Sequence, residues 1–415
     1  MRGFPTVRTS LHRASAQPWS DATSMHREPN AMRRASDIGA NNPGGDDGRT
    51  PMRPIRLARR PSIDTESVIG CEALYRSAKK CWKGVSRKYS AQKYSLNVIA
   101  ETVKLHRALA SGRYKEGATH IVKITYPKPR TALAITFRDR VYQRSLNDNA
   151  LYPQMVRGFI AGNMACQKGK GTTAARQFFK AMLRRAFLKY GTNRFQILCG
   201  DIKGYYDNMV HAVTERLVAK KCDEWTAAKT IETLERQYRF HGDTGYNPGS
   251  QMVQIAGISY LDPFDHFTKE VLRRDLYVRY MDDTRTIGAP DEDMESVKCE
   301  MAKELARVGL YFHPDKTRII RGSDGILFLG FVFRVTDTGR VRVYRDPDKV
   351  KALRRKFRRL ANKVRRGEAE AEVIDESWEC ARACMEEGNS ERSLRNMDDF
   401  INNLKEEINA RDKTI

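Results

Sequence analysis

The pattern of apolar and polar positions divides the chain into an aperiodic segment and a long patterned remainder. Residues 1–62 combine clustered Arg, Pro, Gly and Ser with almost no periodic apolar positions, which predicts a disordered basic arm. From 63 to 111 apolar residues recur at helical spacing. Two short apolar runs at 120–126 and 131–136, joined by Pro127–Arg130, predict a β-hairpin with a basic tip. For the arm, a targeting peptide or a true start at Met52 are alternatives to a nucleic-acid contact.

Beyond the hairpin the helical period alternates with short β-like runs, and no repeat is visible. We predict helices over 138–151, 171–190, 210–238, 251–273 and 291–308, and strands over 194–201, 276–280, 284–288, 325–330 and 341–344. Helices follow Asp346. The first of them places one apolar stripe opposite cations, and the stripe is formed by Val350, Leu353, Phe357, Leu360 and Val364. A membrane-surface helix is the alternative for that segment.

Length and charge narrow the class of protein. The chain has 415 residues, enough for two or three structural units at roughly 150 residues each. Lys and Arg number 75 against 51 Asp and Glu, which gives a formal net charge of +24. A surface this basic suits a polyanionic partner, nucleic acid above all. No run approaches the roughly 20 apolar residues of a membrane span, so we expect a cytoplasmic protein without a membrane partner.

The eight cysteines form neither a C-x-x-C pair nor the framework of a small secreted protein. We therefore expect reduced thiols. Cys380 and Cys384 are four residues apart and could share one helix face, but they lack the other ligands of a zinc site. Simple packing in the interior is the expectation for both.

Two acidic segments contain the candidate chemistry. Asp282 and Asp283 lie at a tight turn between two β-like runs, and Asp201 closes an apolar strand about eighty residues earlier. Adjacent carboxylates repel each other, and a hard divalent cation would neutralise them, although a solvated turn is the commoner explanation of an Asp-Asp pair alone. Carboxylates that converge at strand ends could hold two magnesium ions for phosphoryl transfer.

Together these segments resemble the palm of reverse transcriptases, and among them the enzymes of bacterial retroelements. Asp201 resembles the first catalytic aspartate, and Tyr280-Met-Asp-Asp283 resembles the Y-x-D-D box. The resemblance implies that Asp201 and Asp282 ligate two Mg²⁺ ions, with the Ile202 carbonyl as a further ligand, while Asp283 supports the site. It also implies that Tyr206 is the aromatic residue that excludes a ribose 2′-hydroxyl by its bulk.

Other segments fit the same resemblance in the same order. Lys128 and Arg130 resemble the basic residues of the fingers that bind the incoming triphosphate. Lys168 and Lys170 lie in a segment similar to the K-G-x-G-T motif of bacterial retroelement enzymes, where glycines let backbone amides approach a nucleic acid. A glycine-rich turn before a helix is the alternative there. The apolar run Ile326–Phe333 resembles the primer-grip hairpin.

The remaining candidates lie in three segments. Gly249 and Gln254 occupy the template- and nucleotide-positioning motif, with Val253 where serine is expected, in a form that leans toward diversity-generating enzymes. Lys316 follows the catalytic hairpin and could protonate the leaving pyrophosphate, with a plain surface lysine as the alternative. Arg354 and Arg355 lie on the cationic helix and are expected to contact nucleic acid.

We therefore expect an α+β, right-hand polymerase fold. It would comprise N-terminal helices and fingers (63–190), a palm with an antiparallel sheet packed on helices (191–345) and a helical thumb (346–415). The resemblance implies an RNA-directed DNA polymerase that uses an RNA template, a DNA or RNA primer and deoxynucleoside triphosphates. No room follows the thumb for a nuclease domain, so other proteins would complete any element's cycle.

Several biological roles stay open. A diversity-generating element of a bacterium or phage is one, and an anti-phage defence or retron-like system, with an accessory protein or a dedicated structured RNA, is another. A catalytically silent, RNA-binding relic of the fold is the third. Genome neighbours such as a template/variable repeat pair or a structured RNA would distinguish the first two.

Overall fold

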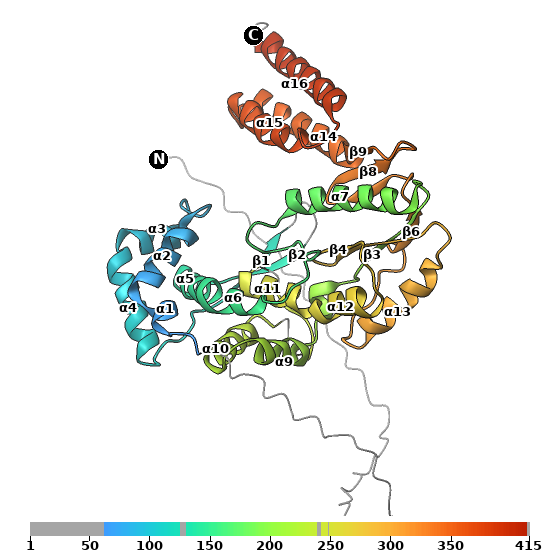
Figure 1. Cartoon of the computed structure of the whole chain (residues 1–415). Coiled ribbons are helices and arrows are strands. Elements are labelled where there is room, and N and C mark those ends of the chain that lie inside the picture. Colours follow the sequence, from blue (N-terminus) through green and yellow to red (C-terminus); the bar gives the residue numbers. More distant parts are fainter. Residues whose placement is uncertain (1–61, 125–129, 239–241, 248, 413–415) are drawn as a thin grey trace, which may run out of the picture. The chain divides into compact units, whose positions relative to one another are not determined.

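The computed structural model describes residues 62–124, 130–238, 242–247 and 249–412, in which helices and strands are mixed (Figure 1). The α+β composition predicted from the sequence is confirmed; the names fingers, palm and thumb stay predictions. The helices are α1 Glu66–Ile69, α2 Cys71–Trp82, α3 Tyr89–Leu96, α4 Val98–Ala110, α5 Phe137–Leu146, α6 Tyr152–Met155, α7 Thr172–Tyr190, α8 Tyr205–Asn208, α9 His211–Lys221, α10 Glu224–Glu235, α11 Gln251–Tyr260, α12 Asp262–His266, α13 Met294–Ala306, α14 Pro347–Arg365, α15 Glu372–Met385 and α16 Glu391–Asp412.

The strands form three antiparallel sheets. A hairpin pairs β1 with β2, a four-stranded sheet has the order β4-β5-β3-β6, and a three-stranded sheet has the order β7-β8-β9. Their bounds are β1 His120–Ile124, β2 Arg130–Ala134, β3 Gln196–Asp201, β4 Tyr277–Tyr280, β5 Asp283–Gly288, β6 Arg318–Arg321, β7 Ile326–Phe328, β8 Phe331–Val335 and β9 Val341–Arg345. The predicted hairpin over 120–136 is confirmed, although its tip, 125–129, lies outside the described residues.

Helices cover both faces of the four-stranded sheet. Along β3, Ile197 and Cys199 belong to the core shared with α7, whereas Leu198 belongs to the core shared with α11 and α13. Figure 1 shows α7 on one side of the sheet and α12 and α13 on the other. Since successive strand residues point to opposite faces, a strand covered on both sides is apolar at almost every position. The continuous run Ile197–Cys199 has this cause.

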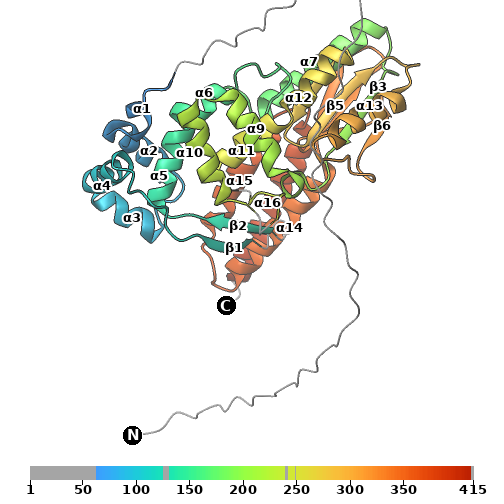
Figure 2. The same ribbon diagram turned by 90° about the horizontal axis from the view of Figure 1, so that it is seen from below.

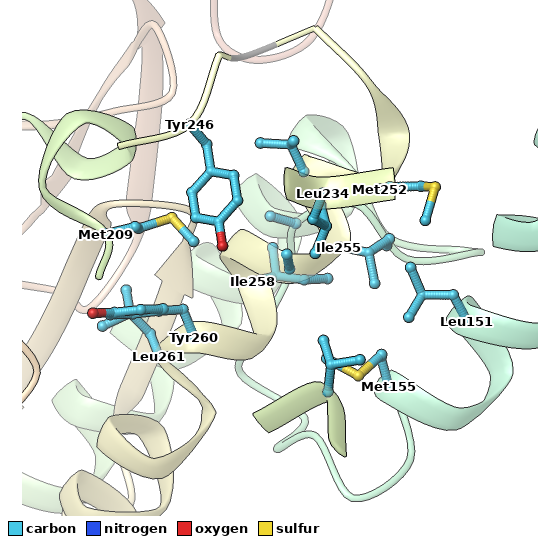
Figure 3. Close-up of a cluster of buried hydrophobic side chains, with 14 of the residues drawn as sticks. Leu151, Met155, Met209, Leu234, Tyr246, Met252, Ile255, Ile258, Tyr260 and Leu261 are labelled. Atoms are coloured by element: carbon cyan, nitrogen blue, oxygen red, sulfur yellow. The ribbon is translucent and has the colours of Figure 1, made fainter. Parts of the chain in front are cut away.

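Helix α11 lies at the centre of the larger core. Its apolar side chains pack among α6, α9 and α10, which lie beside it in Figure 2, and Figure 3 shows Met252, Ile255 and Ile258 pointing into this cluster. Ser250 caps the helix, because its side chain accepts a hydrogen bond of 3.2 Å from the Val253 amide. Only Gln251 and Gln254 of this helix are exposed, so burial of the rest fixes where Gln254 points.

Two predicted helices are interrupted where the sequence pattern continues. The helix over 210–238 is two helices, because Asp223 ends one and caps the next by accepting from the Thr226 amide. The helix over 251–273 breaks at Leu261, ahead of Pro263, and ends in the π-helical segment Phe267–Val271. The helix predicted over 138–151, in contrast, is confirmed; its last turn, Asn147–Leu151, is π-helical and continues into α6. In the two interrupted helices the apolar periodicity of the sequence continues across the position where one helix ends and the next begins.

Strand β6 is missing from the sequence prediction. It has only four residues, and its two arginines are exposed at the ends, so it lacks the apolar run that marks the other strands. It nevertheless pairs with β3, with Cys199 opposite Arg318. The pairing places the segment just before β6, residues 311–317, beside the end of β3.

Helices α14, α15 and α16 enclose a core of their own. Phe357, Trp378, Met397 and Ile401 are buried in it, and the predicted stripe of α14 packs against them. The stripe is therefore confirmed as an interior face. Cys380 and Cys384, in contrast, are exposed on α15, which corrects the expectation that they pack inside; none of the eight cysteines forms a disulfide.

A short loop joins this helical region to the three-stranded sheet. The Asn389 amide donates to the Val343 carbonyl at 2.7 Å, and the Val343 amide donates to the Asn389 side chain at 3.1 Å. Glu387 in the same loop forms an ion pair with Arg176 of α7. Among the described residues, none of the helices has the length and apolar composition required to cross a membrane.

Candidate active site

The turn between β4 and β5 brings two carboxylates to the end of the sheet. β4 ends at Tyr280 and β5 begins at Asp283, which leaves Met281 and Asp282 as a two-residue connection. Met281 has a φ of +57°, in the left-handed region. Tight hairpins require positive φ near their first central residue, and for a non-glycine this costs on the order of 1–3 kcal/mol. The surrounding contacts must hold this turn in place.

Asp201 and Asp282 come together because β3 and β5 are neighbours. Asp201 is the register partner of Asp283, and the next residue, Ile202, donates its amide to the Asp282 carbonyl at 3.1 Å. The amides of Lys203 and His313 pair on the opposite edge, with the carbonyls of Tyr311 and Asp201. Since N–H and C=O of one strand residue point to the same side, the Ile202 carbonyl faces the Asp282 side.

Residues 313–317 surround Asp201 from the β6 side. Lys316 Nζ lies 3.1 Å from Asp201 Oδ2, and its side chain is 56% exposed. The hydroxyl of Thr317 lies 3.2 Å from the Asp201 amide, which donates to it. The predicted catalytic lysine is thus adjacent to the first predicted aspartate, although the two are far apart in sequence.

Asp283 differs from the other two aspartates because it has a fixed cationic partner. Arg285, two residues later on the same strand face, forms an ion pair with it and is 8% exposed. The guanidinium also donates to the Leu327 carbonyl at 2.6 Å and lies over the Phe328 ring. Asp283 is therefore engaged within the protein, which agrees with a supporting role.

Burial and like charges act on this site together. Burial raises the pKa of Asp282, the carboxylates of Asp201 and Asp283 raise it further, and Lys316 opposes them. Burial also raises the pKa of Asp283, against the lowering effect of Arg285. An arrangement that disfavours negative charge in this way is one that a bound cation would stabilise.

The donor set fits magnesium. Among the described residues no group of three His, Cys, Asp or Glu side chains has the geometry of a metal site. The oxygens available are two carboxylates, Asp201 and Asp282, and the Ile202 carbonyl. Mg²⁺ is commonly held by one or two carboxylates while waters and substrate phosphates complete its octahedron, so this sparse set suits Mg²⁺ better than a closed protein cage would.

A small cluster lies beside the turn and includes two more predicted residues. The Cys166 sulfur is 3.8 Å from the Met281 sulfur and 4.0 Å from the Gln254 side-chain oxygen. Tyr206 is near both Cys166 and Asp282, whose charges, after burial, raise its pKa. Its ring packs closely on α11 at Gly257, where an added Cβ would lie 3.2 Å from the ring. Tyr206 and Gln254 are thus close to the aspartates.

The Tyr206 hydroxyl is buried without a hydrogen-bond partner among the described residues. An unpaired buried hydroxyl costs roughly 1–3 kcal/mol, so its retention calls for an explanation. The Tyr206 side chain itself is half-buried.

The segment that leads into the glycine-rich motif contacts the edge of β4 through one isolated bridge. Asn163 forms a parallel bridge with Arg279 at the edge of β4. Lys170 donates to the Asn163 carbonyl at 2.7 Å, and burial lowers the pKa of Lys170. Lys168 is exposed, with its ammonium 5.4 Å from the centre of the Tyr152 ring. Of the two predicted nucleic-acid contacts, Lys168 is the more available, and both stay predictions.

Gly249 lines a different part of the structure from the three aspartates. It lines a cavity of about 540 Å³ between α2, the segment after β2, α5 and the start of α11, and none of the three aspartates lines this cavity. Its wall includes Lys88 and Arg140 and no carboxylate. Lys128 and the side chain of Arg130 lie outside the described residues, so the predicted triphosphate contacts stay predictions.

The two predicted arginines of α14 differ in surroundings. Arg355 is exposed, whereas Arg354 packs on α16, where it donates to the Asn396 carbonyl at 3.4 Å and lies over the Phe400 ring. Arg355 is free to reach a phosphate, and Arg354 supports the helix pair.

Sequence reasoning missed three polar residues of the site: Arg279, Arg285 and Asp265. A buried cation must have a partner, and Arg279 and Arg285 lie on the two strands that flank the aspartates. That signal is visible in the sequence Val278–Ile287. The partner Asp265 is not, because it comes from a different element.

Comparisons with known proteins give partial similarities only. No family model and no curated protein matches the chain. Among solved structures, telomerase from Candida albicans in complex with a fragment of telomeric RNA aligns with 59% of this chain and 49% of its own, at 12% identity and a TM-score of 0.41. Apo telomerase from Candida tropicalis aligns with 57% of this chain and 51% of its own, at 12% identity and a TM-score of 0.41. A form truncated from its C-terminal domain aligns with 54% of this chain and 57% of its own, at 12% identity and a TM-score of 0.39. The chain thus spans about half the length of these structures. At such scores the functional assignment rests on the site itself.

Proposed function

We propose that the protein is an RNA-directed DNA polymerase that uses two Mg²⁺ ions. The observation that supports this most is the convergence of Asp201, Asp282 and the Ile202 carbonyl at the end of one antiparallel sheet. The resemblance of the two segments to the reverse-transcriptase palm, and the net charge of +24, agree with it. A silent relic of the fold would have no need to keep two carboxylates together at a cost in repulsion.

In this proposal Asp201, Asp282 and the Ile202 carbonyl hold the ions, which would activate the primer 3′-hydroxyl and stabilise the leaving pyrophosphate. Arg285 holds Asp283 behind them through their ion pair. Lys316 Nζ is placed to give a proton to the leaving group. The Tyr206 ring and Gln254 bound the space for the nucleotide, and the exposed cations of α14 bind the duplex backbone.

The finer assignment is a bacterial or phage retroelement of the diversity-generating kind. It is supported by the form of the Gly245–Gln254 motif, which the resemblance relates to those enzymes. Val253, the unexpected residue of that motif, is fully buried in the core, whereas Gln254 is exposed beside the site. Defence or retron-like roles, with an accessory protein or a structured RNA, are the alternative.

The test is Mg²⁺-dependent incorporation of deoxynucleotides on a primed RNA template. Asp201→Ala and Asp282→Ala should each lower synthesis by at least about a thousandfold, because each removes a ligand of the reacting centre. RNA binding at matched salt should be unchanged in both. Asp315→Asn is the matched control, since Asp315 is near the site but 88% exposed. It should keep the wild-type rate.

Two outcomes would contradict the proposal. Synthesis retained in either aspartate variant would remove the metal-ligand assignment. If the wild type makes no DNA, the assay is repeated with the RNA that co-purifies from cells, and failure there as well would favour the silent relic.

A further inference from the structure

One buried ion pair lies directly behind the catalytic turn. Arg279 is on β4 and Asp265 is on α12, and both side chains are 0% exposed. Arg279 Nε donates to Asp265 Oδ1 at 2.7 Å, and Nη2 donates to Oδ2 at 2.5 Å. The Tyr277 hydroxyl donates to the same carboxylate at 2.8 Å. This is the two-point geometry in which an arginine–carboxylate pair has a single orientation.

The rest of the guanidinium contacts the backbone of two other elements. Nη2 donates to the Ile258 carbonyl of α11 at 2.9 Å, and Nη1 donates to the Met281 carbonyl at 3.0 Å. The main chain of Arg279 is itself held on the far edge, where it exchanges two hydrogen bonds of 2.9 Å with Gly162 and Met164. The side chain therefore links the turn to α11 and α12, while the main chain of the same residue is held in the sheet.

These contacts determine the orientation of Asp282. Its preceding peptide group is held through the Met281 carbonyl by Arg279, and its following peptide group is held through its own carbonyl by the Ile202 amide at 3.1 Å. A peptide group is planar, so fixing both groups fixes the rotations about the Asp282 Cα. Without Arg279, only one of the two would be held, and the strained φ of Met281 could relax.

We infer that Arg279, oriented by Asp265, is a positioning residue for Asp282; the inference rests on the proposed polymerase function. Stability alone is a poor reason to keep such a pair. Replacing both partners of a buried ion pair by apolar residues of similar volume is often neutral or stabilising, whereas removing one partner is strongly destabilising. An apolar pair would preserve stability but could not donate to the Met281 carbonyl, whereas Arg279, whose main chain is held in the sheet, can.

The test replaces both charges at once. Arg279→Met with Asp265→Leu should fold, with thermal unfolding close to that of the wild type, while Arg279→Met alone should be unstable. The matched control is Lys221→Met with Asp262→Leu. This pair is 2.5 Å apart, is 15% and 10% exposed, and uses the same helix α12 without reaching the turn.

Three measurements separate positioning from structure. In the Arg279/Asp265 double variant we expect the maximal rate of single-nucleotide incorporation to fall on the order of a hundredfold, as a displacement of about 1 Å would cause. Affinity for primer–template should change less than twofold. Binding of Mn²⁺ to the protein, followed by electron paramagnetic resonance, should weaken at least fivefold. The control variant should match the wild type in all three.

Each outcome decides the inference. A double variant with a rate and a Mn²⁺ affinity within twofold of wild type overturns it and leaves the pair as a structural feature. If the wild type makes no DNA, the polymerase proposal fails, but weaker Mn²⁺ binding in the double variant alone would still support positioning of Asp282. Absence of Mn²⁺ binding by the wild type overturns both.

Discussion

Charged side chains have opposite arrangements in the four-stranded sheet and in helix α14. In the sheet, Arg279 and Arg285 are almost fully buried, and each is paired with a carboxylate and donates to backbone carbonyls. On α14, Arg355, Lys356 and Lys363 are exposed, and none of the carboxylates in the described part of the chain lies within salt-bridge distance of them. A cation fixed by several partners can orient a neighbour, whereas a solvated one can only attract.

A second helix shows that exposure alone does not explain the difference. On α13, Lys298, Lys303 and Arg307 each have a glutamate three residues earlier, at 2.9, 2.6 and 2.7 Å. On α14, Lys351 is paired in this way with Asp348 at 3.4 Å, but Arg355, Lys356 and Lys363 are not. The excess of positive charge is therefore concentrated where a polyanion could use it.

The largest effect should follow from breaking a fixed pair of the sheet. Arg285→Met leaves the Asp283 carboxylate without its cation in a poorly hydrated place, which should lower the free energy of unfolding by about 3 kcal/mol. Urea denaturation measures this. Adding Asp283→Asn should recover most of the loss. Equal stability of the single and double variants would show that Arg285 acts through packing on Phe328 instead.

A smaller effect should follow at Tyr206, which borders Asp282. If the ring excludes a 2′-hydroxyl, Tyr206→Ala should lower the preference for deoxynucleotides over ribonucleotides by about 10–200-fold in kcat/KM, the range for one small group in a pocket. Tyr206→Phe is the matched control, because it keeps the ring and removes only a hydroxyl that has no partner among the described residues. A loss of preference in the Phe variant would assign discrimination to the hydroxyl.

The smallest effect should follow on the exposed helix. Replacing Arg355 and Lys356 by Gln should weaken binding to primer–template on the order of tenfold and reduce the salt slope by about 2, since each phosphate contact contributes roughly 1. Unfolding should be unchanged. Lys298→Gln with Lys303→Gln on α13 removes the same charge and should leave the affinity within twofold. Similar losses in both variants would mean that only net charge matters.

The sequence predicts those parts of the fold in which apolar residues follow one regular spacing, that of a helix or that of a strand. The long amphipathic stripe of α14, the apolar run of β3 and the hairpin of β1 and β2 are all recovered, because their residues alternate or recur regularly. Breaks are not recovered. Asp223 and Pro263 interrupt stretches whose apolar periodicity continues on both sides, and β6 has too few residues to form a pattern.

The candidate site divides in the same way. Asp201, Asp282 and Lys316 can each be recognised from the short motif that surrounds it, and the structure brings the three residues together. The residues that hold them are different. Arg279 pairs with Asp265 and also donates to the Met281 carbonyl, and these contacts join three elements that only the tertiary structure brings together.

The separate core of α14, α15 and α16 has a consequence for how such a protein changes over generations. Phe357 and the apolar stripe of α14 pack into this core, whereas Arg355, Lys356 and Lys363 on the outer face of the helix are exposed. If this face binds nucleic acid as proposed, preference for a new partner could evolve, or be selected in the laboratory, through substitutions that leave the candidate active site unchanged. The two properties need not be traded against each other.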